Sequence, residues 1–206
     1  MTDRRREILH AALAIADSDG LDAVTMRAVA RRVGVTPMAL YPYVGGKGAL
    51  LDGLIEMLLT ELPKPDPGVT GWDRMIALAH GVREVAHRHP AVIGLLFSRP
   101  SVTADSMRTV DELYGALLGA GVPEGDIARV ERLVSTMVIG FALSEVGGRF
   151  GTGSLTTRQR RAQLAAADLP AHHRLAEHLD EPVDWDAEFD RDLEDLRLMV
   201  ERIAAR

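Results

Sequence analysis

The sequence of 206 residues contains no cysteine, and aromatic residues make up only 4% of it. The absence of cysteine excludes disulfides, thiolate catalysis and cysteine-ligated zinc or iron–sulfur centres. Charged residues or glycines interrupt every apolar run before it reaches the roughly 18 residues that a membrane span needs. The N-terminal residues lack the apolar segment of a secretion signal. We therefore expect a cytoplasmic protein without membrane contact.

The chain also lacks an excess of positive charge, because its formal net charge is -6. This argues against a protein that coats nucleic acid through bulk charge. The cations are unevenly distributed, however: residues 1–48 hold seven Lys or Arg against five acids, a charge of +2 that leaves -8 for the rest. A mildly basic head on an acidic body suggests divided labour, although ordinary solvated faces give a similar balance.

Apolar residues recur at helical spacing along nearly the whole chain, and alternating β-branched runs are few. This pattern predicts an all-α fold with an N-terminal three-helix head and a larger helical body. Glycines, prolines and capping residues divide the pattern. We expect a head at 1–47, a connecting helix at 48–62 and a body at 63–206, with body helices at 70–89, around 107–118, at 123–147 and at 185–205 and an irregular stretch at 148–184.

Patterns for catalysis and metal binding are incomplete. The Gly45-Gly46-Lys47-Gly48 segment lacks the first glycine and the final Ser or Thr of a phosphate-binding loop. His173 and His178 are five residues apart and diverge on a helix, so they do not form a metal site. No nucleophile stands in a recognisable pattern with a base. We predict no catalytic site, no metal and no cofactor.

Residues 25–47 carry the most specific pattern. Two short helical segments meet at a turn containing Gly34, and Ala30, Val35 and Leu40 are compact enough for the helices to cross closely. This is the construction of a helix-turn-helix, whose second helix enters the major groove of DNA. We expect phosphate contacts from polar side chains and base-edge contacts from the tip of the second helix. The former are Thr25, Arg27, Tyr41, Tyr43 and Lys47, and the latter are Thr36, Pro37, Met38 and Ala39.

This stretch resembles the TetR family of one-component transcriptional repressors over about residues 4–62. The resemblance implies a repressor that binds operator DNA, with Tyr41, the Tyr43-Val44 pair and Lys47 contacting phosphates or bracing the head. Two departures from the family pattern are Pro42, within the second helix, and Gly48, behind the lysine. The matching elements are Thr25, Ala30, Gly34-Val35, Leu40-Tyr41, Tyr43-Val44, Lys47 and Leu50-Leu51.

The body is similar, more weakly, to the tetracycline-repressor branch of that family. The similar segments are Ala49–Asp52, Gly71-Trp72 and Ser98–Pro100. In that branch a histidine near the last of these segments ligates the magnesium of the drug complex. This chain has no histidine between residues 90 and 171. The resemblance therefore implies the fold of the body but not a magnesium–tetracycline ligand.

We expect a homodimer in which the helices at 123–147 and 185–205 pack against their symmetry mates, because residues 189, 193, 196, 200 and 203 form a heptad-like seam. Such a dimer would present its heads to a near-palindromic operator and be released by an unknown small-molecule effector. A ligand-binding protein whose head has lost DNA affinity and a small helical enzyme remain alternatives. The effector residues predicted in the body are Arg83, Phe97, Arg99, Met107, Tyr114, Met137 and Phe141. Residues of these types at helical spacing are more often plain core than ligand contacts.

Overall fold

The computed structural model describes residues 3–64, 66, 68–99, 103–150 and 157–205. Within these ranges every regular element is helical, which confirms the predicted all-α fold. None of the described helices is long and apolar enough to cross a membrane. Pro65, Pro67 and Pro100 lie outside the described residues.

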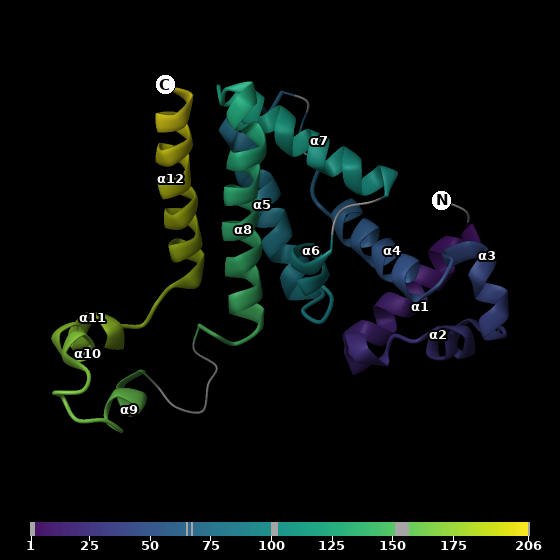
Figure 1. Cartoon of the computed structure of the whole chain (residues 1–206), viewed down its shortest axis with the longest axis horizontal. Helices are drawn as coiled ribbons and strands as arrows, with labels where there is room; N and C mark the ends of the chain where they lie inside the picture. The colour runs from purple at the N-terminus through teal and green to yellow at the C-terminus, as the bar shows by residue number, and fades with distance from the viewer. Residues whose placement is uncertain (1–2, 65, 67, 100–102, 151–156, 206) are drawn as a thin grey trace.

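The head consists of three helices and two short 3₁₀ segments, and a fourth helix connects it to the body (Figure 1). The predicted connecting helix begins and ends close to where the sequence placed it. The bounds are α1 Asp3–Asp19, α2 Met26–Val33, α3 Tyr41–Val44 and α4 Lys47–Thr60, with 3₁₀ segments at Leu21–Ala23 and Pro37–Leu40.

The body is built from three long helices around α5, and a small lobe projects from it (Figure 1). The predicted helix at 123–147 begins as a 3₁₀ segment, Glu124–Asp126, and becomes α-helical only at Ile127. The body helices are α5 Gly71–Arg88, α6 Gly94–Ser98, α7 Ala104–Gly119, α8 Ile127–Val146 and α12 Trp185–Ala204, and the lobe holds α9 Thr157–Arg161, α10 Pro170–Arg174 and α11 Ala176–Asp180.

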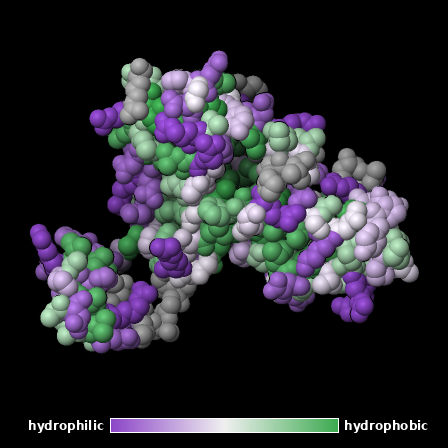
Figure 2. Space-filling view, viewed as in Figure 1, coloured by the Kyte–Doolittle hydropathy of each residue, from purple (hydrophilic) through white to green (hydrophobic). Residues whose placement is uncertain are grey.

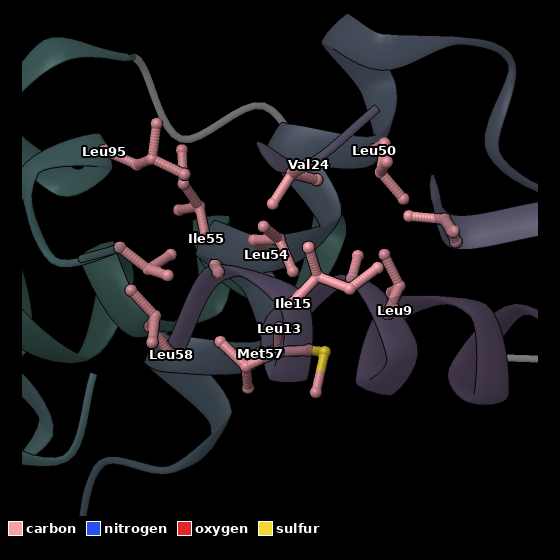
Figure 3. Close-up of a cluster of buried hydrophobic side chains, with 14 of the residues drawn as sticks. Leu9, Leu13, Ile15, Val24, Leu50, Leu54, Ile55, Met57, Leu58 and Leu95 are labelled. Atoms are coloured by element: carbon pink, nitrogen blue, oxygen red, sulfur yellow. The ribbon is translucent and has the colours of Figure 1, made fainter. Parts of the chain in front are cut away.

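One apolar core joins the head to α4 and continues into the body (Figure 3). Leu9 and Leu13 of α1 lie in the same cluster as Leu54 and Leu58 of α4, and Leu95 of α6 extends it. Gly53 permits this close approach, because a Cβ built at residue 53 would lie 2.5 Å from Cδ2 of Leu9. The connecting helix is therefore part of the packing of both units rather than a flexible tether.

A second core fills the body between α5, α7, α8 and α12. The heptad-like seam of α12 belongs to this core: Phe189, Leu193 and Val200 are buried there with their neighbours on the same face. The expectation that this seam pairs with a second copy is therefore wrong. An apolar stripe on an amphipathic helix buries against whatever apolar surface is nearest, and for α12 that surface is its own α8.

We expect Gly53→Ala to lower the free energy of unfolding by about 1–2 kcal/mol, because overpacking against the fully buried Leu9 outweighs the better helix propensity of alanine. Gly115→Ala is the matched control. A Cβ at residue 115 of α7 meets nothing within 4 Å, so the same exchange there stabilises the chain. Urea unfolding of both variants measures this difference, and equal effects would contradict the packing described for α1 and α4.

Candidate nucleic-acid interface and internal cavity

Local hydrogen bonding defines the first helix of the predicted helix-turn-helix. Oγ1 of Thr25 accepts a hydrogen bond from the backbone N–H of Ala28 at 3.1 Å, which caps α2 as the sequence predicts. The helix ends at Gly34, whose φ of 73° is left-handed and favours glycine. The N–H of Val35 then donates to the carbonyl of Ala30 at 2.9 Å, which closes the turn.

The second helix of the predicted helix-turn-helix is not one continuous α-helix. Residues Pro37–Leu40 form a 3₁₀ turn and α3 follows as one short α-helical turn. Pro42 has no N–H to donate to the carbonyl of Met38 four residues earlier, and that carbonyl accepts from Tyr41 instead. Thr36 has the extended backbone of a cap, but its side chain makes no capping hydrogen bond.

Residues 36–44 have a buried side that anchors them in the core and an exposed side that faces solvent. Leu40 and Val44 are buried in the core shared with α1 and α4. Met38 at the tip is 74% exposed, and Tyr41 and Tyr43 are also exposed. The structure places all the predicted DNA-contacting residues on the outside of the head, namely Thr25, Arg27, Thr36, Pro37, Met38, Ala39, Tyr41, Tyr43 and Lys47.

The cations of the head divide into those that form ion pairs and those that do not. On α1, Arg4 pairs with Glu7 and Arg6 pairs with Asp3. Arg5 of α1 donates two hydrogen bonds of 3.1 Å to the carboxylate of Glu56, which is 6% exposed on α4, so this guanidinium braces the head. The second group surrounds the exposed segment, and its side chains make no hydrogen bond or ion pair within the described ranges. These residues are Arg27, Arg31, Arg32 and Lys47.

A further ion pair joins the body to the head end of α4. Arg99, directly after α6, donates to Oδ1 of Asp52 through Nε at 3.0 Å and through a terminal nitrogen at 2.7 Å. The same terminal nitrogen lies 3.3 Å from the carbonyl oxygen of Gly48. Because Asp52 and Gly48 lie in the first turns of α4, this contact couples α6 to the part of α4 nearest the DNA-facing segment.

A cavity of about 180 Å³ that is partly open to solvent lies between α4, α5, α6, α7 and α8. Most of its wall is apolar, and three polar residues contribute, from α7 and α8. Such a concave, mainly apolar site with few polar groups is typical of small-molecule binding. The lining residues are Leu59, Leu62, Met75, Leu78, Ala79, Val82, Leu96, Thr109, Val110, Leu113, Glu131, Val134, Ser135, Val138 and Ile139.

None of the predicted effector residues is among those that line this cavity. Phe97 and Met107 are more than half exposed, and Arg99 holds Asp52. Tyr114 and Met137 pack against the second core. The periodic pattern marks which helix faces are apolar, but it does not tell which part of an apolar face borders a void. The only signal in the sequence that could have indicated this cavity is weak: the polar residues Glu131 and Ser135 lie among the buried valines of α8.

The remaining two predicted residues, Arg83 and Phe141, belong to a structural network on α5, α8 and α12. Arg83 donates to both carboxylate oxygens of Glu145, at 2.6 and 2.8 Å, and lies 2.7 Å from Asp186. Its guanidinium carbon is 5.8 Å from the ring centroid of Phe141 and 5.2 Å from that of Phe189. The hydrogen bond from Arg83 lowers the pKa of Glu145 against the opposing effect of burial.

Comparison with known proteins identifies the family. Residues 8–54 match the model of the bacterial regulatory proteins of the tetR family, and residues 64–205 match the tetracyclin repressor-like C-terminal domain. The chain belongs to the TetR family. TetR proteins are DNA-binding regulators, and the first of the two matches covers the helix-turn-helix described above.

Several curated TetR relatives are similar to this chain. The transcriptional repressor DrrR1 of Streptomyces coeruleorubidus is 30% identical over 68% of the chain, which spans about half (52%) of that relative. A transcriptional regulator of Saccharopolyspora erythraea is 31% identical over 90% of the chain and 79% of the relative. The class A tetracycline repressor from Escherichia coli is 31% identical over 77% of the chain and 74% of the relative.

Solved structures show the same TetR architecture. The Streptomyces coelicolor protein ActR in complex with actinorhodin aligns over 100% of this chain and 99% of its own with a TM-score of 0.83 and 26% identity. Apo ActR aligns over 98% of both chains with a TM-score of 0.80. The agreement extends across head and body, so both units described here have the fold of TetR regulators.

The Arg83–Glu145 pair predicts a pH-dependent contribution to stability. Because the folded-state pKa of Glu145 is lowered, its contribution is present above the ordinary carboxyl value of 4.5 and is lost as the pH falls through the folded pKa. We expect Glu145→Gln to cost about 2 kcal/mol at neutral pH, since it leaves a poorly compensated, largely buried guanidinium. Thermal unfolding should show this difference shrinking below pH 4.5. Glu84→Gln, at an exposed position on α5, is the control, and a pH-independent difference for Glu145→Gln would contradict the assignment.

Proposed function

We propose that this TetR protein is a transcriptional repressor that binds a near-palindromic operator as a homodimer and is released by a small-molecule effector. In this proposal the head, residues 1–47, contacts DNA. Residues 48–62 connect the head to the body, and the body, residues 63–206, binds the effector and dimerises. We propose that the chain acts in the cytoplasm, where its operator lies, and has no enzymatic activity.

The exposed face of the head carries this proposal. Residues 36–39 present a tip with few hydrogen-bonding side chains, and Met38 suits apolar contact with thymine methyl groups. Around the tip, Tyr41, Tyr43 and the cations that make no ion pair within the described ranges supply hydrogen bonds and charge for phosphates. The inward side of the same segment is fixed by Leu40 and Val44, so the DNA-facing side chains are presented by a rigid support.

We place the dimer interface on the outer faces of α8 and α12, the faces that do not enter the second core. On α8, Leu133 is 38% exposed, and a Cβ built at Gly140 meets nothing within 4 Å, which leaves room for a helix to approach closely. On α12, Leu198 is 52% exposed. Figure 2 shows hydrophobic surface gathered over the middle of the body, in the region of α8. Ala142 on the same helix is buried in the chain's own core and takes no part.

Effector binding reaches the head through α4. Leu59 near its end and Leu62 beyond it line the cavity, whereas Lys47 begins the helix beside the DNA-facing segment. With 14 residues, α4 is about 21 Å long, so a small tilt at the cavity end displaces the head. Leu96 of α6 also lines the cavity. A shift of α6 would move Arg99, which directly follows this helix, and through its hydrogen bond would move Asp52 of α4. Release of a bound dimer requires the effector to prefer the DNA-incompetent state by about 10²–10⁴-fold.

Binding to the DNA upstream of the chain's own gene tests the proposal. We expect Lys47→Ala and Tyr41→Ala to weaken operator affinity. Lys47→Ala should also make the log–log slope of affinity against salt shallower by about two units, because the dimer then neutralises two phosphates fewer, one for each subunit. Fluorescence anisotropy at several salt concentrations measures both quantities.

Lys64→Ala is the matched control, because it removes the same charge from an exposed position outside the head. Operator affinity that is absent in the wild-type chain at near-physiological salt would favour the other candidate, a ligand-binding protein without a working DNA head. The acidic net charge and Pro42 are the features that favour this second candidate.

The dimer interface has its own test. We expect the double variant Leu133→Asp with Leu198→Asp to sediment as a monomer at micromolar concentration, since four buried carboxylates would enter the interface of a dimer. Leu118→Asp, an exposed leucine on α7, is the control and should leave the dimer intact. If the double variant sediments as a dimer, the interface does not lie on these faces of α8 and α12.

A further inference from the structure

The cavity between α4 and α8 carries its polar atoms on one side. Its wall consists of apolar side chains except at Thr109 of α7 and at Glu131 and Ser135 of α8. Residues four apart on a helix are neighbours on its surface, so Glu131 and Ser135 form one polar patch. A ligand in this cavity therefore meets hydrocarbon on most of its surface and a carboxylate with a hydroxyl at one place.

Glu131 differs from the other large acidic residue on α8. The carboxylate of Glu145 is held by Arg83. In contrast, the side chain of Glu131, which is partly buried, makes no hydrogen bond or ion pair in the ranges that the structure describes. Among the same described residues, no lysine or arginine lines this cavity to neutralise it.

An unpaired carboxylate in an apolar wall selects ligands by charge. A neutral apolar ligand would remove water from the carboxylate without replacing its hydrogen bonds, which is unfavourable. An anionic group placed there would add repulsion between like charges. An ammonium group instead donates charge-assisted hydrogen bonds, which are shorter and stronger than those between neutral groups.

We propose that the effector is an apolar organic cation, an amine whose ammonium group binds Glu131 with Ser135 beside it and whose hydrocarbon part fills the leucine- and valine-lined space. This inference rests on the proposed function of the cavity as the effector site. It specifies the ligand class that the proposed function leaves open.

The volume of the cavity limits the hydrocarbon part. An engineered apolar cavity of about 150 Å³ accommodates benzene, so the 180 Å³ observed here takes about one aromatic ring with a short chain. A second hollow shares Leu59, Leu62, Leu78 and Thr109 with the first and is bordered by Lys64, Arg108 and Glu112. Larger amines would extend toward this more polar space.

Three probes with one hydrocarbon body and different head groups test the charge selection. Phenylbutylamine, phenylbutanol and phenylbutanoate are titrated into the full-length protein at neutral pH by isothermal calorimetry. The amine should bind about tenfold tighter than the alcohol or more, as a hydrogen bond to a charged group predicts, and the carboxylate should bind most weakly.

Two variants assign the selection to the cavity. Glu131→Gln should lower the affinity for the amine about tenfold while leaving that for the alcohol unchanged, because only the charge is removed. Glu84→Gln, on an exposed face of α5 outside the cavity, should change neither. Val110→Phe fills the cavity from α7 and should abolish binding of all three probes; circular dichroism verifies that each variant is folded.

The outcomes separate this inference from the proposed function. Equal affinities for the three probes, undiminished amine binding by Glu131→Gln, or no binding of the amine to the wild-type protein would each overturn the assignment of a cationic ligand. Operator binding and its reduction in Lys47→Ala are measured without any ligand. A failure of the head to bind DNA is thus recognised independently of the charge of the ligand.

Discussion

The packing of α4 against both the head and the body is the constraint on which the rest of the structure depends. Its leucines lie in one continuous core with α1 and with parts of α5 and α6. Two ion pairs fix the same helix, Arg5 with Glu56 from the head and Arg99 with Asp52 from the body. Close-packed interiors transmit strain because they have few voids to absorb it. A change in the cavity wall at the end of α4 therefore alters the position of the head.

Because of this packing, the outward-facing side chains of the DNA-facing segment are not needed for the core. Leu40 and Val44 anchor residues 36–44 from the inside, so their outward neighbours need not contribute to the core. Arg5 is used to brace the head, whereas the cations beside the exposed segment retain their hydrogen-bonding capacity. A chain with a net charge of -6 can present a local basic surface because phosphate contacts depend on nearby cations far more than on the total charge.

The helix α8 serves three environments at once. Its valines enter the second core, Glu131 and Ser135 face the cavity, and Leu133 and Gly140 lie on the outer side. Successive side chains of an α-helix point about 100° apart around its axis, so one helix can carry three different stripes of residues on three faces. The arrangement brings the proposed effector site within one helix diameter of the proposed dimer interface. In the proposed dimer, one rigid element would therefore link effector binding to the relative placement of the two heads.

The sequence by itself determined the helices, most of their ends and the surface of the head. Thr25, Gly34 and Pro37 act through local backbone chemistry, which depends only on near neighbours in the chain. Tertiary structure decided how the apolar faces are shared: the seam of α12 packs on its own body, and none of the predicted effector residues lines the cavity. Helical periodicity states that a face is buried but not what covers it, because partners distant in sequence meet only when the whole chain has packed. For the same reason Glu131 became a candidate for ligand selection only once the structure placed it in an apolar wall, without an ion-pair partner among the described residues.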